Sequence, residues 1–117
     1  MLLHITTMPA WQAARIAGDY RSESLSTEGF IHTSTPQQVA GVANARFVGR
    51  GDLILLCIDA EKVRAPIRYE PADGDLYPHI YGPLNIDAVT QVVEWMPAPD
   101  GTFRLPSSLG HGADGIG

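Results

Sequence analysis

The sequence predicts a single α+β domain in which two short helices pack on a bent, mainly antiparallel sheet. Three observations favour this fold: an apolar run of strand length at 53–58, an alternating apolar and polar segment at 63–70, and a helix-start motif at 35–38. The chain has 117 residues, the usual size of one domain. We therefore expect residues 1–105 to form one domain and residues 106–117, rich in Gly and Ser, to form a flexible C-terminal tail.

The first predicted elements are a strand at 2–6 and a helix that follows it directly. Thr7 is a typical helix N-cap, and Gly18 is suited to end the helix in a left-handed conformation. The residues from 19 to 28 are polar and rich in Ser, so we expect a loop there. A short extended segment at 29–32 should follow the loop.

The start of the second helix is the clearest local signal. Thr35 as N-cap, Pro36 at the first helical position and Gln38 three residues after the cap form a capping box. Apolar residues then recur at helical spacing as far as Phe47, and Gly49 closes the helix. This pattern predicts a helix from Pro36 onward.

The remaining elements are strands. The continuous apolar run at 53–58 predicts a central strand that is covered on both faces. The alternating segment predicts a half-buried strand, and Pro66 within it favours an edge position. We expect a turn at 71–75 and the last main strand at 88–95, which is rich in Val and Thr.

Composition excludes several classes of function. The formal net charge is −5, and the eight Lys and Arg residues form no basic run, which argues against binding to duplex nucleic acid. No apolar run approaches the length of a membrane span, and the N-terminus lacks a signal-peptide pattern. Cys57 is the only cysteine, which suits a reducing compartment. We therefore expect a soluble, cytoplasmic protein without membrane contact. Composition does not identify a protein partner.

Three of the four histidines lie at the ends of predicted elements, beside hydroxyl or turn residues. They are His4, His32 and His79. Strand ends that open into loops are where functional sites are usually built on a rigid scaffold. Because imidazole donates, accepts and titrates near neutral pH, such a cluster is suited to ligand binding or proton transfer. We predict that the three histidines line one polar cleft.

Two further positions are candidates. Glu70 closes the alternating strand, where it could act as a general base or accept a bond from a ligand hydroxyl; an exposed ion pair with Arg68 or Arg64 is the alternative. Ser34 lies just before the predicted helix start, where free backbone N–H groups favour a ligand phosphate.

Two segments carry a family resemblance, Gly29-Phe30-Ile31-His32-Thr33-Ser34 and Pro78-His79-Ile80-Tyr81-Gly82-Pro83-Leu84. Over roughly residues 2–95 the chain resembles domain-of-unknown-function family 952, an uncharacterised bacterial and plant family. That family is distantly similar to compact ADP-ribosyltransferase-like proteins, which include RNA 2′-phosphotransferases. The resemblance implies a compact ADP-ribosyltransferase-like fold.

The resemblance also implies roles for residues of the site. His4 would hold the ribose hydroxyls of NAD, and His32 with Ser34 would lie near the nicotinamide or a phosphate. Glu70 or Glu94 would be the acidic residue of the transfer step. The candidate catalytic residues are therefore Glu70, His32 and His79, and the candidate ligand-binding residues are His4, Thr6, Ser34, Arg68 and Tyr81.

Three functions fit these residues. The first is an enzyme, or a degenerate enzyme, that binds NAD or a related nucleotide without a metal, with ADP-ribosyl- or phosphotransferase-like chemistry and with Arg68 neutralising phosphate. The second is a hydrolase-like zinc site formed by the three clustered histidines, with Glu70 as a fourth ligand or base. The third is a non-catalytic module that binds a small metabolite or a protein.

Overall fold

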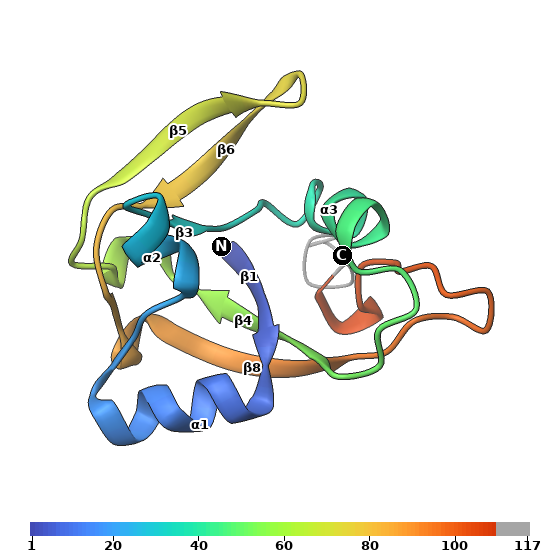
Figure 1. The fold of residues 1–117 in the computed structure, drawn as a ribbon, viewed down its shortest axis with the longest axis horizontal. Helices are drawn as coiled ribbons and strands as arrows, with labels where there is room; N and C mark the ends of the chain where they lie inside the picture. Colours follow the sequence, from blue (N-terminus) through green and yellow to red (C-terminus); the bar gives the residue numbers. More distant parts are fainter. Residues whose placement is uncertain (110–117) are drawn as a thin grey trace.

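The computed structural model describes residues 1–109, which form a compact α+β fold (Figure 1). Its first sheet is antiparallel, with the strand order β1-β4-β8. Every residue of β4 is buried, so the apolar run is the central, doubly covered strand that the sequence predicts. The three strands are β1 (Leu2–Thr7), β4 (Leu53–Ile58) and β8 (Val89–Trp95).

The second three-stranded sheet has the order β3-β6-β5 and continues the first one. The link is an antiparallel bridge between Leu3 of β1 and Ser34, which follows β3. A third, two-stranded sheet pairs β2 with β7. The bounds of these strands are β2 (Asp19–Tyr20), β3 (Ile31–His32), β5 (Ile67–Ala72), β6 (Asp75–Ile80) and β7 (Leu84–Asn85).

The helices are short. Thr7 caps α1, accepting a hydrogen bond from the Ala10 N–H at 3.4 Å, and Gly18 ends the helix with φ of 99°, as its sequence predicts. Within residues 1–109, no helix is long and apolar enough to cross a membrane. The helical segments are α1 (Met8–Ala17), α2 (Glu23–Thr27), α3 (Val39–Arg46) and the single-turn 3₁₀ segments η1 (Ala60–Lys62) and η2 (Ile86–Ala88).

The prediction of a loop at 19–28 is wrong in part, because β2 and α2 lie there. β2 depends on a distant partner, since Tyr20 is buried and pairs with Leu84. α2 depends on packing, since Leu25 lies against the core cluster, and the Ser24 hydroxyl also donates to the Phe30 carbonyl at 2.7 Å. Because the contacts of Tyr20 and Leu25 are tertiary, local propensity does not reveal them.

The predicted helix after Thr35 starts three residues later than expected, since α3 begins at Val39. Half of the capping box nevertheless forms. The Thr35 N–H donates to Gln38 Oε1 at 3.0 Å, and the Val39 N–H reaches the Thr35 carbonyl at 3.1 Å. The motif therefore positions the chain for the helix, although the residues before Val39 form a turn.

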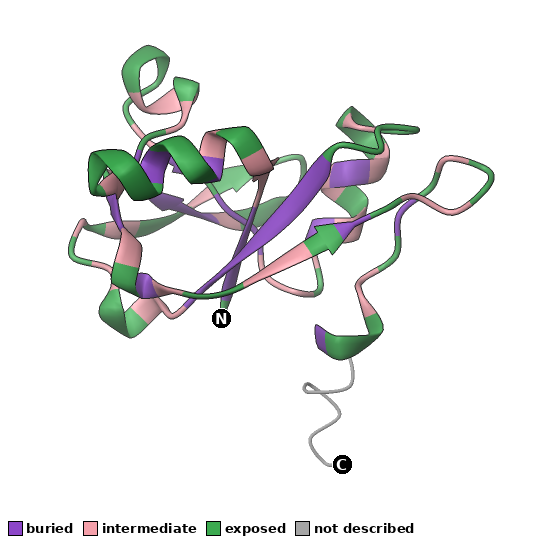
Figure 2. Cartoon of the chain, turned by 90° about the horizontal axis from the view of Figure 1, so that it is seen from below, coloured by how far each residue is buried: buried purple, intermediate pink, exposed green. Residues whose placement is uncertain are grey.

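The core lies on both faces of β4. Its even-numbered residues pack with α1 in one cluster, and its odd-numbered residues pack with α3 in another. The residues of this central strand are purple, the colour of buried residues, in Figure 2. Phe103 and Leu109 belong to the second cluster and are almost fully buried. Leu109 lies within the predicted tail of 106–117, whose residues 110–117 are outside the described part of the chain.

Strands β5 and β6 form a hairpin that projects from the rest of the fold (Figure 1). Its two-residue turn is Asp73-Gly74, with φ values of 50° and 82°. Positive φ at both positions is typical of a type I′ turn, which suits Asp-Gly. The turn predicted at 71–75 is therefore shorter in the structure, because Pro71, Ala72 and Asp75 belong to the strands. Pro71 continues β5, because an edge strand tolerates a missing N–H.

Gln38 ties this hairpin to the start of α3. Its amide donates to Asp75 Oδ2 at 2.9 Å and to the Leu76 carbonyl at 2.8 Å, while its Oε1 holds the Thr35 N–H. We expect Gln38→Ala to increase amide hydrogen exchange at the hairpin, because the bonds that hold it are lost. The free energy of unfolding should fall by only about 1 kcal/mol, because these bonds are exposed to solvent. Gln37→Ala is the matched control, since Gln37 is exposed. Equal exchange in the two variants would contradict this role for Gln38.

Candidate functional site

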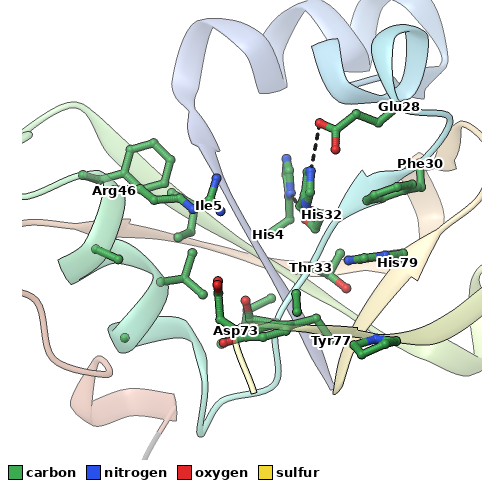
Figure 3. Close-up of a pocket in the computed structure, with 18 residues that line it drawn as sticks. His4, Ile5, Glu28, Phe30, His32, Thr33, Arg46, Asp73, Tyr77 and His79 are labelled. Atoms are coloured by element: carbon green, nitrogen blue, oxygen red, sulfur yellow. Dashed lines mark hydrogen bonds and ion pairs between the residues drawn. The ribbon is translucent and has the colours of Figure 1, made fainter. Parts of the chain in front are cut away.

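A cleft of about 690 Å³ lies between β1, β3, α3 and the β5–β6 hairpin (Figure 3). The structure brings His4, His32 and His79 to this cleft from three different strands, together with Ser34. The predicted convergence of the three histidines therefore occurs in the fold. The continuous run of strands explains it, since the bridge after β3 places β1 beside β3, and β3 pairs with β6.

The His4 ring is buried and its two nitrogens both have protein partners. Nδ1 lies 2.6 Å from the His32 carbonyl, which only accepts, so Nδ1 carries the proton. Nε2 lies 2.8 Å from the Tyr20 hydroxyl, which also contacts Thr6 Oγ1 at 3.0 Å. Burial lowers the pKa of His4 to about 4, against the bond to His32, which raises it. His4 is therefore neutral at pH 7 and holds β1, β2 and β3 together.

Glu70 lies behind His79. The two residues are on the same face of the hairpin, because side chains alternate along β5 and β6 and Glu70 pairs with Tyr77. The Glu70 carboxylate accepts a bond from His79 Nδ1 at 2.8 Å and a short bond from the Tyr81 hydroxyl. The hydrogen bond from Tyr81 lowers the pKa of Glu70 most, and the hydrogen bond from His79 lowers it further. The bond to Glu70 in turn raises the pKa of Tyr81.

The His79 ring is oriented on two sides. Phe30 stacks on it, with ring centroids 4.0 Å apart and an angle of 13° between the planes. The ionised Glu70 only accepts, so the proton of neutral His79 is on Nδ1 and Nε2 carries a lone pair. No residue in the range 1–109 forms a hydrogen bond with Nε2, and His79 lines the cleft. This arrangement is suited to accepting a proton from a bound molecule.

His32 provides a second imidazole at the same end of the cleft. Its Nε2 lies 3.2 Å from Glu28 Oε2, and both side chains are about half exposed. The His32 and His79 ring centroids are 5.4 Å apart. Two imidazoles, each beside a carboxylate, therefore face one hollow, which is the arrangement needed when one group takes a proton and another gives one.

The other predicted site residues lie around the cleft rather than in its lining. Thr6 contacts Tyr20, and Arg68 lies over the Tyr81 ring with its guanidinium carbon 5.1 Å from the centroid. Arg68 and Tyr81 therefore support Glu70, which in turn supports His79. Their roles in binding a ligand stay predictions, as does the catalytic role of Glu70.

Sequence reasoning missed three charged residues of the lining, Glu28, Arg46 and Asp73, and the aromatic residue Phe30. A signal exists for Arg46 and Asp73. Asp73-Gly74 is a strong hairpin motif, and Arg46 lies four residues after Val42, on the same face of α3. Phe30 is only half-buried and stacks on His79.

A metal site would need several ligands whose donor atoms converge. In the described residues, no group of three or more His, Cys, Asp or Glu side chains is arranged to hold a metal ion. The three clustered histidines do not form such a group, because both nitrogens of His4 are bonded within the protein.

Comparison with known proteins gives a family but no activity. The sequence matches the family described as "Protein of unknown function (DUF952)" over residues 5–92. Crystal structures of protein CC0527 from Caulobacter crescentus are similar, with a TM-score of 0.84, 30% identity and coverage of 93% of this chain and 97% of that chain. The solution structure of the same protein has a TM-score of 0.78 with 30% identity, and covers 89% and 91% of the two chains. No curated protein matches. The chain therefore belongs to the DUF952 family of proteins of unknown function.

Proposed function

We propose that the cleft binds a nucleotide-like small molecule and that His79 and His32 transfer protons while a phosphate ester of that molecule is cleaved. The observation that supports this proposal best is the Glu70–His79 pair, whose free Nε2 lies at the cleft beside a second imidazole. A cleft of about 690 Å³ is within the usual range for small-molecule sites.

The proposed step conserves protons. A water molecule or a ligand hydroxyl attacks phosphorus, and its proton passes to Nε2 of His79. The bond from phosphorus to the leaving oxygen breaks, and that oxygen takes a proton from the His32 imidazolium. The two histidines exchange their proton with solvent before the next turnover. Glu70 stabilises the positive charge that develops on His79, as carboxylates beside catalytic histidines do.

Of the two chemistries that the family resemblance implies, the geometry favours the phosphotransferase-like one. Transfer of ADP-ribose proceeds through an oxocarbenium-like state, which is stabilised by a carboxylate in contact with the ribose. Glu70 is already bonded to His79 and Tyr81 and is not part of the lining of the cleft. The imidazole pair, in contrast, lines the cleft directly.

NAD and related nucleotides are the ligands to test. Phe30 and Tyr77 supply aromatic rings in the cleft lining, which suit a planar base, and Ser34 supplies a hydroxyl. His4 acts in this proposal as a positioning residue for His32, because its Nδ1–H donates a hydrogen bond to the His32 carbonyl rather than to a ligand.

The test combines binding with turnover. We expect NAD at millimolar concentration to raise the melting temperature, as a ligand that binds only the folded state does. We also expect slow hydrolysis of bis(4-nitrophenyl) phosphate with a bell-shaped dependence on pH, since one imidazole must be neutral and the other charged. Binding of NAD without any hydrolysis would support the non-catalytic module instead. The absence of both NAD binding and hydrolysis would refute the proposal.

A further inference from the structure

Within residues 1–109, Arg46 is the one arginine or lysine in the lining of the cleft, and it forms no ion pair with a carboxylate. Arg46 is in the last turn of α3, is exposed, and lines the cleft. No salt bridge forms between Arg46 and any other residue of the described part of the chain. The neighbouring Arg50, by contrast, is paired with Asp52 at 2.6 Å. The Arg46 guanidinium is therefore available for a ligand.

Arg46 lies away from the imidazole pair. Figure 3 shows it beside Ile5, on the other side of the cleft from His79. The wall around it is apolar, since Val42, Ala45 and Phe47 of the same helical segment also line the cleft. A charged hydrogen bond made beside apolar side chains is stronger than one made in open water. This end of the cleft is thus suited to hold an anionic group.

The same cleft limits how much negative charge it accepts. Glu28 and Asp73 are also in the lining, so two carboxylates face one guanidinium when the histidines are neutral. Glu28 is bonded to His32, whereas Asp73 is at the tip of the hairpin. Arg46 is in position to contact one anionic group of a ligand, whereas a second negative charge would have no further arginine or lysine of the lining to contact and would be repelled by the carboxylates.

We infer that Arg46 anchors a single negative charge, and that the cleft therefore selects phosphodiesters and other monoanions over phosphomonoesters, which are dianions. This inference rests on the proposed function and names its substrate class. The phosphodiester is held by Arg46 through a forked contact to its two free oxygens. Asp73 and Glu28 exclude the additional charge of a monoester.

The test uses two probes that differ by one methyl group. Methyl phenyl phosphate is a monoanionic diester, and phenyl phosphate is a dianionic monoester at pH 8. Phenol is a poor leaving group, so both probes are hydrolysed slowly and their binding to the intact wild-type protein is measured by calorimetry. We expect the diester to bind more tightly than the monoester. Arg46→Gln should weaken diester binding by about tenfold or more, because it removes a charge-assisted contact.

Two variants complete the experiment. Arg15→Gln is the matched control, since Arg15 is also an exposed basic residue in the last turn of a helix but is not in the cleft lining. Asp73→Asn removes one carboxylate while keeping the turn, because Asn-Gly also favours type I′. It should reduce the preference for the diester.

The outcomes separate this inference from the proposed function. If the diester binds but Arg46→Gln behaves as Arg15→Gln does, the Arg46 anchor is wrong while the cleft remains a binding site. If the monoester binds as tightly as the diester, the charge selection is wrong. If neither probe binds to the wild-type protein and NAD does not bind either, both proposals fail together.

Discussion

His79→Ala should lower kcat for cleavage of bis(4-nitrophenyl) phosphate by about 10²- to 10⁴-fold, the usual contribution of a general base. The reason is geometric: Nε2 of His79 is the acceptor at the cleft, and both Glu70 and Phe30 fix its direction. Since His79 is buried, the substitution could also destabilise the fold, so the melting temperature of the variant must be measured beside its rate. A folded variant with the wild-type kcat would exclude His79 as the base.

A second variant separates positioning from catalysis. Glu70→Gln keeps an oxygen that accepts from Nδ1 but removes the charge that favours the imidazolium. We expect a smaller loss of kcat than in His79→Ala, because the ring stays oriented while the charge that stabilises the imidazolium during the reaction is removed. Tyr69→Phe is the control, because Tyr69 is exposed on the same strand and does not line the cleft. A wild-type kcat in a folded Glu70→Gln variant would show that the charge of the carboxylate does not contribute to catalysis.

The second large effect concerns the stability of the fold at mildly acidic pH. His4 has a pKa of about 4 in the folded protein against 6.5 in an unfolded chain, chiefly because it is buried. Below pH 6.5 the unfolded chain binds a proton at His4 that the folded protein does not bind. The contribution of neutral His4 to the free energy of unfolding is therefore fully present above pH 6.5 and is lost as the pH falls toward 4. At 1.36 kcal/mol for each pKa unit, about 2 kcal/mol of unfolding free energy should be lost between pH 7.5 and pH 5.

Urea denaturation at several pH values measures this loss. In His4→Gln the loss between pH 7.5 and pH 5 should be much smaller, because glutamine does not titrate, although the variant is less stable at neutral pH. His32→Gln is the matched control and should keep the wild-type slope, since the His32 side chain is about half exposed. The groups with lowered carboxyl pKa values, such as Asp75 and Asp87, titrate below this range. A wild-type slope in His4→Gln would refute the assignment.

Local patterns predicted the main frame of the fold. The apolar run of β4 identified the central strand, and Thr7 and Gly18 marked both ends of α1. The elements that were missed are those whose stability comes from distant contacts. The two-residue strand β2 exists because Tyr20 pairs with Leu84, and no pattern within a few residues encodes that pairing.

The site was predictable to a similar extent. The three histidines share one cleft as predicted, although His4 lies within β1 and not at its end, because β1, β3 and β6 are linked in the sheets. What the sequence did not reveal is how each ring is bonded. His4 is occupied by Tyr20 and the His32 carbonyl, and this depends on coordinates that no spacing rule supplies. For the same reason Arg68 was expected to meet phosphate, whereas Arg46 is the cation that faces the hollow.

The bridge between Leu3 and Ser34 determines which part of the molecule is able to adapt to a guest. The bridge joins the strands that carry His4 and His32 into one wall of the cleft. This wall cannot widen unless the two backbone hydrogen bonds between Leu3 and Ser34, at 2.8 and 2.9 Å, are broken. The opposite wall is the β5–β6 ribbon, whose inner end pairs with β3 and whose outer end is bonded, within residues 1–109, to the Gln38 side chain at the start of α3. Entry of a bulky molecule would therefore bend the outer end of the ribbon, and the affinity for larger substrates would depend on how easily the Gln38 bonds break.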